Sequence, residues 1–229
     1  MLTATTAGGW LLVAPGPAQA APGNAPSEAQ AHHELLRLSD LPKGWKATGT
    51  RTAPPARASG SGPPATASQL SQVAACEGVS TARIDKAPPS AQAAFARTSR
   101  FELVLETVAV FPAQRAARAF FALFSSPKAT SCVGPMLGRT LGSGRSQAGV
   151  TTSKLTIARL RLRPVGAPAS ALRLGVPLES HGAEAEIVGD VVVIRSGRSV
   201  AVLLPLALSP GPRAAFVHAI AMEAARRLR

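Results

Sequence analysis

The sequence predicts an α+β domain in which several helices pack against a mainly antiparallel sheet. Two observations indicate this class. Four stretches between residues 152 and 207 have strand patterns with short connections, and amphipathic helical patterns stand before and after them. Helices that are segregated from a run of antiparallel strands are typical of α+β domains.

Four helices are expected. They lie over about 27–38, over 68–76, over 113–124 and in the closing segment "PGPRAAFVHAIAMEAARRLR". Helical spacing gives two of them a clear apolar stripe. The stripe of the third helix is Ala116, Phe120, Leu123 and Phe124, and that of the last is Phe216, Val217, Ile220, Ala224 and Leu228.

The first clear strand is "FELVLETVAVF", residues 101–111. Its alternation places Glu102 and Glu106 on one face and Phe101, Leu103 and Leu105 on the other, so we expect a half-buried strand with its glutamates in solvent. The later strands are expected at 152–163, 171–179, 184–195 and 199–207, with "RSGR" (195–198) as a tight hairpin turn.

The N-terminus is expected to be a secretory signal peptide over 1–20, because it is uncharged and ends in Ala18-Gln19-Ala20. The basic residue usual near the start of such a signal is missing, which favours a true start upstream of Met1; a disordered Ala/Pro-rich tail is the alternative. Residues 21–34 are expected to form a flexible leader and 35–229 a single domain with exposed loops at 51–66 and 139–150. The longest later apolar run, "VAVLLPLAL", is too short to span a bilayer, so a secreted protein that does not span the membrane is expected.

The chain has two cysteines, Cys76 and Cys132. In an oxidising compartment two lone cysteines most often pair. Metal ligation is disfavoured because neither cysteine has a second Cys or a His at ligand spacing. A catalytic thiolate is disfavoured because His32 and His33 lie in the expected leader and His218 inside a helix. A Cys76–Cys132 disulfide is therefore expected, with two free buried thiols as the alternative, and no metal or cofactor is predicted.

Arginine dominates a net charge of +13, which biases an exported protein towards anionic partners. In "LTIARLRLRP", Arg159, Arg161 and Arg163 alternate with apolar residues, so a strand would place three guanidiniums on one sheet face, where Arg173 is placed to join them. These four arginines are candidate anion-binding residues. The alternative is a solvated outer face. Nucleic acid is not an expected partner, because no aromatic residues are interleaved with the basic positions.

No recognised catalytic pattern occurs in the sequence. "LGSGRS" (141–146) lacks the Walker pattern and no G-x-S-x-G is present. Glu102 and Glu106, and likewise Glu184 and Glu186, share a strand face, but such neighbours are usually solvated or paired with arginine. His181 is the one histidine expected in a loop of the folded domain, and no matching Ser or Asp pattern accompanies it.

The segments "LLRLSDLPKGW", "VAACEGV", "VAVFP", "FSSPKATSC" and "VVVIRSGRSVAVLLPL" occur in this order. These segments and their order resemble those of the extracellular sensor-like domains of actinobacterial secreted and lipid-anchored proteins. The best-known members are the ligand-binding ectodomains of mycobacterial transmembrane Ser/Thr kinases of the PknH-like group. The resemblance covers about residues 35–229. It implies a curved antiparallel sheet packed by helices, a cleft for an unknown ligand, and a structural disulfide between Cys76 and Cys132. It supplies no catalytic residue.

Together these observations predict a secreted, monomeric, non-enzymatic binding module of the cell envelope. Its cleft would take a small or lipidic, anionic ligand. One alternative is a structural envelope protein that adheres to anionic wall polymers through its net positive charge. The other is a hydrolase with an unrecognised Ser/His site.

Overall fold

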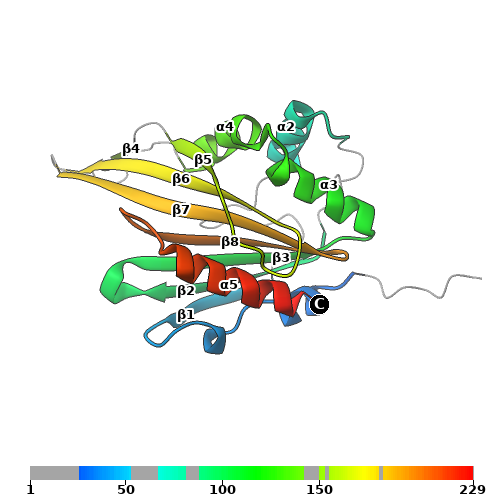
Figure 1. Ribbon diagram of the computed structural model, residues 1–229, viewed down its shortest axis with the longest axis horizontal. Helices are drawn as coiled ribbons and strands as arrows, with labels where there is room; N and C mark the ends of the chain where they lie inside the picture. The colour runs from blue at the N-terminus through cyan, green and yellow to red at the C-terminus, as the bar shows by residue number, and fades with distance from the viewer. Residues whose placement is uncertain are drawn as a thin grey trace, which may run out of the picture.

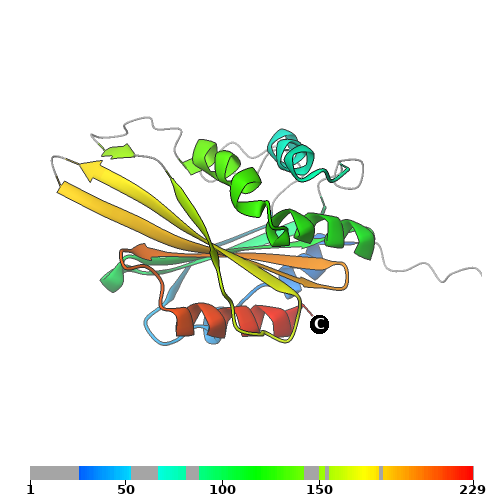
Figure 2. The ribbon, with the colours of Figure 1, turned by 45° about the horizontal axis from the view of Figure 1, so that its top comes forward.

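The computed structural model describes residues 26–52, 67–80, 88–141, 150–152, 155–180 and 183–228. The predicted signal peptide, most of the predicted loop at 51–66, residues 142–149 and His181 lie outside this part of the chain. Within it, a strongly twisted sheet separates helix α5 from helices α2, α3 and α4 (Figure 2). The predicted α+β class with an antiparallel sheet is confirmed.

Every pairing between the eight described strands is antiparallel, and their order is β1-β2-β3-β8-β7-β6-β4 (Figure 1). Strand β5 also pairs with β6, beside β4. The strands are β1 (Lys46–Thr52), β2 (Ser90–Arg97), β3 (Glu102–Val110), β4 (Val150–Thr152), β5 (Thr156–Leu160), β6 (Ala169–Ser180), β7 (Ala183–Ser196) and β8 (Ser199–Leu208).

The helices form the two outer layers. They are α1 (Glu28–His33), α2 (Ala67–Glu77), α3 (Gln114–Ser125), α4 (Ala129–Leu141) and α5 (Ala214–Arg227), and the short 3-10 helices η1 (Leu38–Asp40) and η3 (Thr98–Arg100) add one turn each. Helix α1 begins at the N-cap Ser27, whose hydroxyl accepts a hydrogen bond from the Gln30 N–H at 3.1 Å.

Each face of the sheet has its own apolar core. The first core joins α5 and the N-terminal segment to β2, β3, β7 and β8, and the second joins α2, α3 and α4 to β6, β7 and β8. On β7 the alternation is direct: Val192 and Ile194 belong to the first core, Val191 and Val193 to the second. A strand that is buried on both faces reads as a continuous apolar run, as "VVVI" does in the sequence.

Several predicted elements are confirmed with small shifts in their ends. The helices at 68–76 and 113–124 and the closing helix are present as α2, α3 and α5. The hairpin between β7 and β8 turns at residues 197 and 198, where Gly197 has a φ of 54° and Ser196 pairs with Ser199. Glycine suits this left-handed conformation because it has no Cβ.

Other predictions are wrong. The helix expected over 27–38 ends at His33, and Ala31 within it is fully buried, so this part of the predicted flexible leader belongs to the domain. The strand expected over 152–163 is interrupted and ends at Leu160. Helix α4 includes residues 139–141, which were assigned to a loop. Strands β1 and β2 and helix α4 were not predicted.

The two faces of β3 are the reverse of the prediction. Glu106 lies among the first-core residues Val104 and Val108 and is 1% exposed, whereas Leu105 is 37% exposed. Glu102, near the start of the strand, is half-buried and forms an ion pair with Arg97 of β2. The alternation of residue types is correctly read, but one carboxylate faces the core instead of solvent.

Candidate functional site

A pocket of about 710 Å³ opens between α1, η1 and the strands β1 and β2. Its volume falls within the range of small-molecule sites. Six of its ten lining residues are apolar: Ala29, Leu35, Leu36, Leu38, Ala47 and Phe95. The other four are Glu28, His32, His33 and Arg37.

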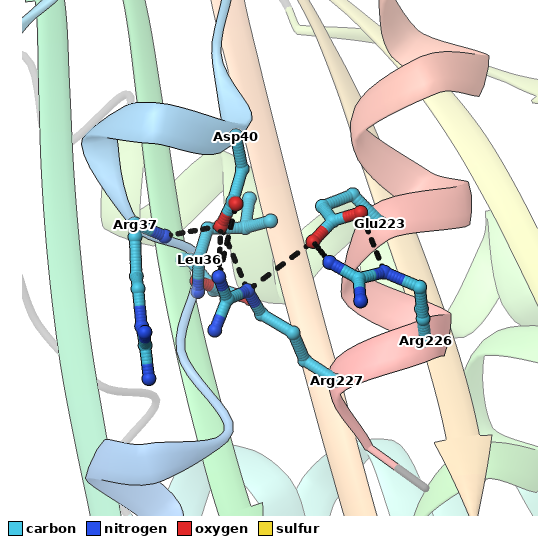
Figure 3. Close-up of polar contacts among 7 residues, drawn as sticks. Leu36, Arg37, Asp40, Glu223, Arg226 and Arg227 are labelled. Atoms are coloured by element: carbon cyan, nitrogen blue, oxygen red, sulfur yellow. Dashed lines mark hydrogen bonds and ion pairs between the residues drawn. The ribbon is translucent and has the colours of Figure 1, made fainter.

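The polar residues of the pocket come from a short stretch of chain, from α1 to the residue before η1. The side chains of His32, His33 and Arg37 are exposed and form no hydrogen bond or ion pair with other described residues. Figure 3 shows the Arg37 guanidinium pointing away from the neighbouring Asp40–Arg227 contact. A guanidinium binds carboxylate or phosphate groups well, and an imidazole donates at least one further N–H. Glu28 is the single carboxylate among the residues that line the pocket.

Leu36, Arg37 and Leu38 form one wall of the pocket, and the backbone of Leu36 attaches this wall to the sheet. The N–H of Leu36 donates to Oε2 of Glu106 at 2.6 Å. The other carboxyl oxygen of Glu106, Oε1, is buried and has no hydrogen-bond partner among the described residues. Burial raises the pKa of Glu106 to about 8, because the charged form loses its hydration; the Leu36 N–H and Arg227 oppose this shift. The neutral acid is therefore the main form at neutral pH.

A second carboxylate holds the next residue of the wall (Figure 3). Asp40 accepts a hydrogen bond from the Arg37 backbone N–H at 2.6 Å and two from Arg227 of α5, at 2.7 and 2.9 Å. Arg227 also lies 3.5 Å from Glu223. Partial burial tends to raise the pKa of Asp40, but the bonds from Arg227 and Arg37 outweigh it and lower this pKa below 3.8. This carboxylate is ionised at neutral pH.

The candidate anion-binding arginines do not gather on one sheet face. Arg159 lies in β5 and donates to the backbone carbonyl of Ser125 at the end of α3, at 3.2 Å. Arg161 and Arg163 follow the end of β5 and are exposed. Because the strand ends at Leu160, the alternation that would align the three guanidiniums is lost.

Arg173 is engaged elsewhere. Its register partner on β5 is Ala158, so its side chain lies on the opposite face of the sheet from that of Arg159. Arg173 donates two hydrogen bonds to the fully buried Asp190 of β7, at 2.8 and 2.9 Å. The bond to Asp190 raises the pKa of Arg173. This arginine neutralises a buried carboxylate.

Cys76 of α2 and Cys132 of α4 form a disulfide, with their Cα atoms 5.6 Å apart. The predicted pairing is confirmed, and neither sulfur is available as a nucleophile or a ligand. No group of three or more His, Cys, Asp or Glu side chains arranged to hold a metal ion occurs among the described residues. No helix in the same part of the chain is both long enough and apolar enough to cross a bilayer.

No protein-family model and no curated protein sequence matches the chain. A search of solved structures finds a likeness that covers 90% of this chain and 98% of the other, with a TM-score of 0.50 and 14% sequence identity. The chain is similar in fold to the extracellular domain of PknH from Mycobacterium tuberculosis. The resemblance to the PknH domain that the short motifs predicted is thus confirmed for the fold.

The sequence motifs that resemble the PknH domain include only part of the pocket. The motifs that resemble the PknH domain include "LLRLSDLPKGW", which contains the wall residues Leu36 and Arg37. The resemblance predicts a cleft, but its location was not predicted, because His32 and His33 were assigned to a leader. The helix start at Ser27 was predicted, but the burial of Ala31, which packs this helix against the domain and places His32 and His33 beside the pocket, was not.

Proposed function

We propose that this protein is an extracytoplasmic, non-enzymatic binding module whose pocket takes a singly charged anionic amphiphile of the cell envelope. The observation that carries this proposal is the pocket itself. A guanidinium and two imidazoles that have no partner among the described residues stand beside a mostly apolar lining that includes Phe95 and Leu38. Such a site matches a ligand with one acidic headgroup and an apolar body.

The charges of the pocket narrow the ligand class. Arg37 contributes one positive charge and Glu28 one negative charge. A headgroup with several negative charges would be repelled by Glu28, whereas a single acidic group beside Arg37 leaves Glu28 free to accept from a ligand hydroxyl. A net charge of +13 raises the local concentration of anions around the whole molecule. The disulfide and the fold likeness to an extracellular domain support a place outside the cytoplasm.

The proposal is tested by calorimetric titration with decanoate, decane-1-sulfonate and decyl phosphate at neutral pH. The first two carry one charge, so they are expected to bind more tightly than the phosphate ester, which is mostly doubly charged. Arg37→Gln should lower the affinity for the sulfonate about tenfold or more, because a charge-assisted hydrogen bond contributes about 1.5 to 3 kcal/mol. Ala47→Phe should reduce binding by filling the pocket from an exposed strand position.

Arg159→Gln is the matched control, because Arg159 is also exposed but lies outside the pocket lining. It should bind the sulfonate as the wild-type protein does. Unchanged binding in both pocket variants would refute the proposal. If both pocket variants lose affinity, native mass spectrometry of protein purified from its own host would identify the natural amphiphile by its mass.

A second candidate function rests on the exposed arginines. Arg161 and Arg163 are solvent-exposed beyond the end of β5, as a surface that adheres to wall polyanions requires. Adhesion of this kind needs no pocket and weakens steeply with salt. Replacement of Arg159, Arg161 and Arg163 by Gln should then weaken binding to teichoic acid or anionic liposomes, while Arg37→Gln should weaken it much less.

A further inference from the structure

One residue belongs both to the pocket and to a buried titratable contact. Leu36 lines the pocket, and its N–H donates to Oε2 of Glu106 at 2.6 Å. Glu106 is 1% exposed and its Oε1 has no partner among the described residues. Movement of the segment that carries Leu36 would therefore break the one hydrogen bond of this carboxyl group to the described residues and open a path for water to it.

Apart from the Leu36 N–H, no described residue donates a hydrogen bond to Glu106 in place of water. Its register neighbours on the sheet are Ala93 of β2 and Leu203 of β8, both apolar. From the helical side, the charged groups that act on it are Arg227 of α5 and Asp40 of η1. Arg227 already donates two hydrogen bonds to Asp40, and its remaining contact is with Glu223.

We propose that Glu106 couples the pocket to pH: its neutral acid holds the wall at Leu36 in place, and its ionisation loosens the wall and weakens the binding of an anionic ligand. The second half of this statement rests on the proposed function; the first does not. The bond from the Leu36 N–H favours the ionised carboxylate, but the desolvation of the buried charge is the larger effect, and the added negative charge acts in the same direction as desolvation. An ionised Glu106 regains hydration when the wall moves, so ionisation favours this movement. The ionised carboxylate also places a negative charge behind a site for anions, which lowers the affinity for an anionic ligand.

Amide hydrogen exchange tests the movement of the wall without a ligand. The protection factors of the amides of residues 36–41, corrected for the intrinsic pH dependence of exchange, are compared between pH 7 and pH 9. With a pKa of about 8, the fraction of neutral Glu106 falls about tenfold over this interval, so protection should fall by about tenfold in the wild-type protein. In Glu106→Gln it should remain constant.

Glu102→Gln is the matched control, because it removes a carboxylate from the same strand without touching the wall; it should behave as wild type. An equal fall of protection in the wild-type protein and in Glu106→Gln would overturn the inference. So would a wild-type protection factor that does not change with pH.

Titration with decane-1-sulfonate, whose charge is constant over this range, tests the effect on binding. The wild-type affinity should fall from pH 7 to pH 9 by up to about tenfold, the limit reached when the ionised form does not bind, and that of Glu106→Gln should change much less. Equal pH profiles would overturn the coupling. If the sulfonate binds neither protein while the exchange result holds, the control of the wall by Glu106 stands and the proposed ligand class is wrong.

Discussion

The substitution Glu106→Gln is expected to stabilise the protein above neutral pH and to leave its stability nearly unchanged at pH 4.5. The reason is the difference between the pKa of about 8 in the folded protein and that of 4.5 in the unfolded chain. Because the folded protein holds this proton more tightly, the free energy of unfolding falls as pH rises from about 4.5 to about 8. Asp40, whose pKa is lowered, has the opposite effect and acts only below about pH 3.8.

The size of the effect follows from the same two values. At about 1.4 kcal/mol for each pKa unit, the loss of stability between pH 4.5 and pH 8 is on the order of 5 kcal/mol. Domains of this size have a total stability of about 5 to 15 kcal/mol, so one carboxyl group accounts for a large part of it. Glutamine has nearly the same shape and does not ionise, so the variant should keep this stability at pH 8.

Urea unfolding followed by circular dichroism at intervals between pH 4.5 and 9 measures both proteins. The two curves of unfolding free energy against pH should meet at the acidic end and separate steadily above it. Glu102→Gln should follow the wild-type curve, because Glu102 is only half-buried and is paired with Arg97. Parallel curves for the wild-type protein and Glu106→Gln would refute the argument.

Three further predictions concern the stability of other parts of the fold, and each is measured by urea unfolding at neutral pH. Replacement of both cysteines by Ala should cost about 4 kcal/mol, because the disulfide closes a loop with a sequence separation of 56; a loss below about 1 kcal/mol would contradict this. Arg173→Met should cost more than Asp190→Ala, about 3 to 5 against about 2 kcal/mol, since it leaves a fully buried carboxylate unpaired while the arginine can reach solvent; the reverse order would contradict the assignment. Phe216→Ala should cost about 2 kcal/mol and alter tryptophan emission, because Phe216 stacks on Trp45 with ring centroids 5.2 Å apart.

The strands with strong apolar alternation were predictable, and those built from small residues were not. The apolar run in β7 and the glycine turn at its end give a clear hairpin signal. Strand β2, "SAQAAFAR", contains Phe95 as its one large apolar residue, and β1, "KATGTRT", contains Gly49 and no large apolar residue. Alanine and glycine have low strand propensity, so these two strands are defined by their partners in the sheet.

Helix α4 was missed because Pro135 lies inside it, and a proline within a helical pattern normally indicates its end. The orientation of β3 was missed for a different reason. Sequence patterns assign charged residues to solvent, and the burial of Glu106 depends on the backbone N–H of Leu36, which is 70 residues away in the chain. The partner of Arg173 had a visible signal, because Asp190 is a lone charge within the apolar sequence "IVGDVVVI".

The two helical layers are secured by different kinds of bond. On one face of the sheet, a covalent link joins α2 to α4. On the other face, hydrogen bonds to the carboxyl groups of Glu106 and Asp40 hold the segment between α1 and β1. Asp40 also accepts hydrogen bonds from the guanidinium of Arg227. A thiol reductant and an alkaline medium would therefore release opposite sides of the molecule.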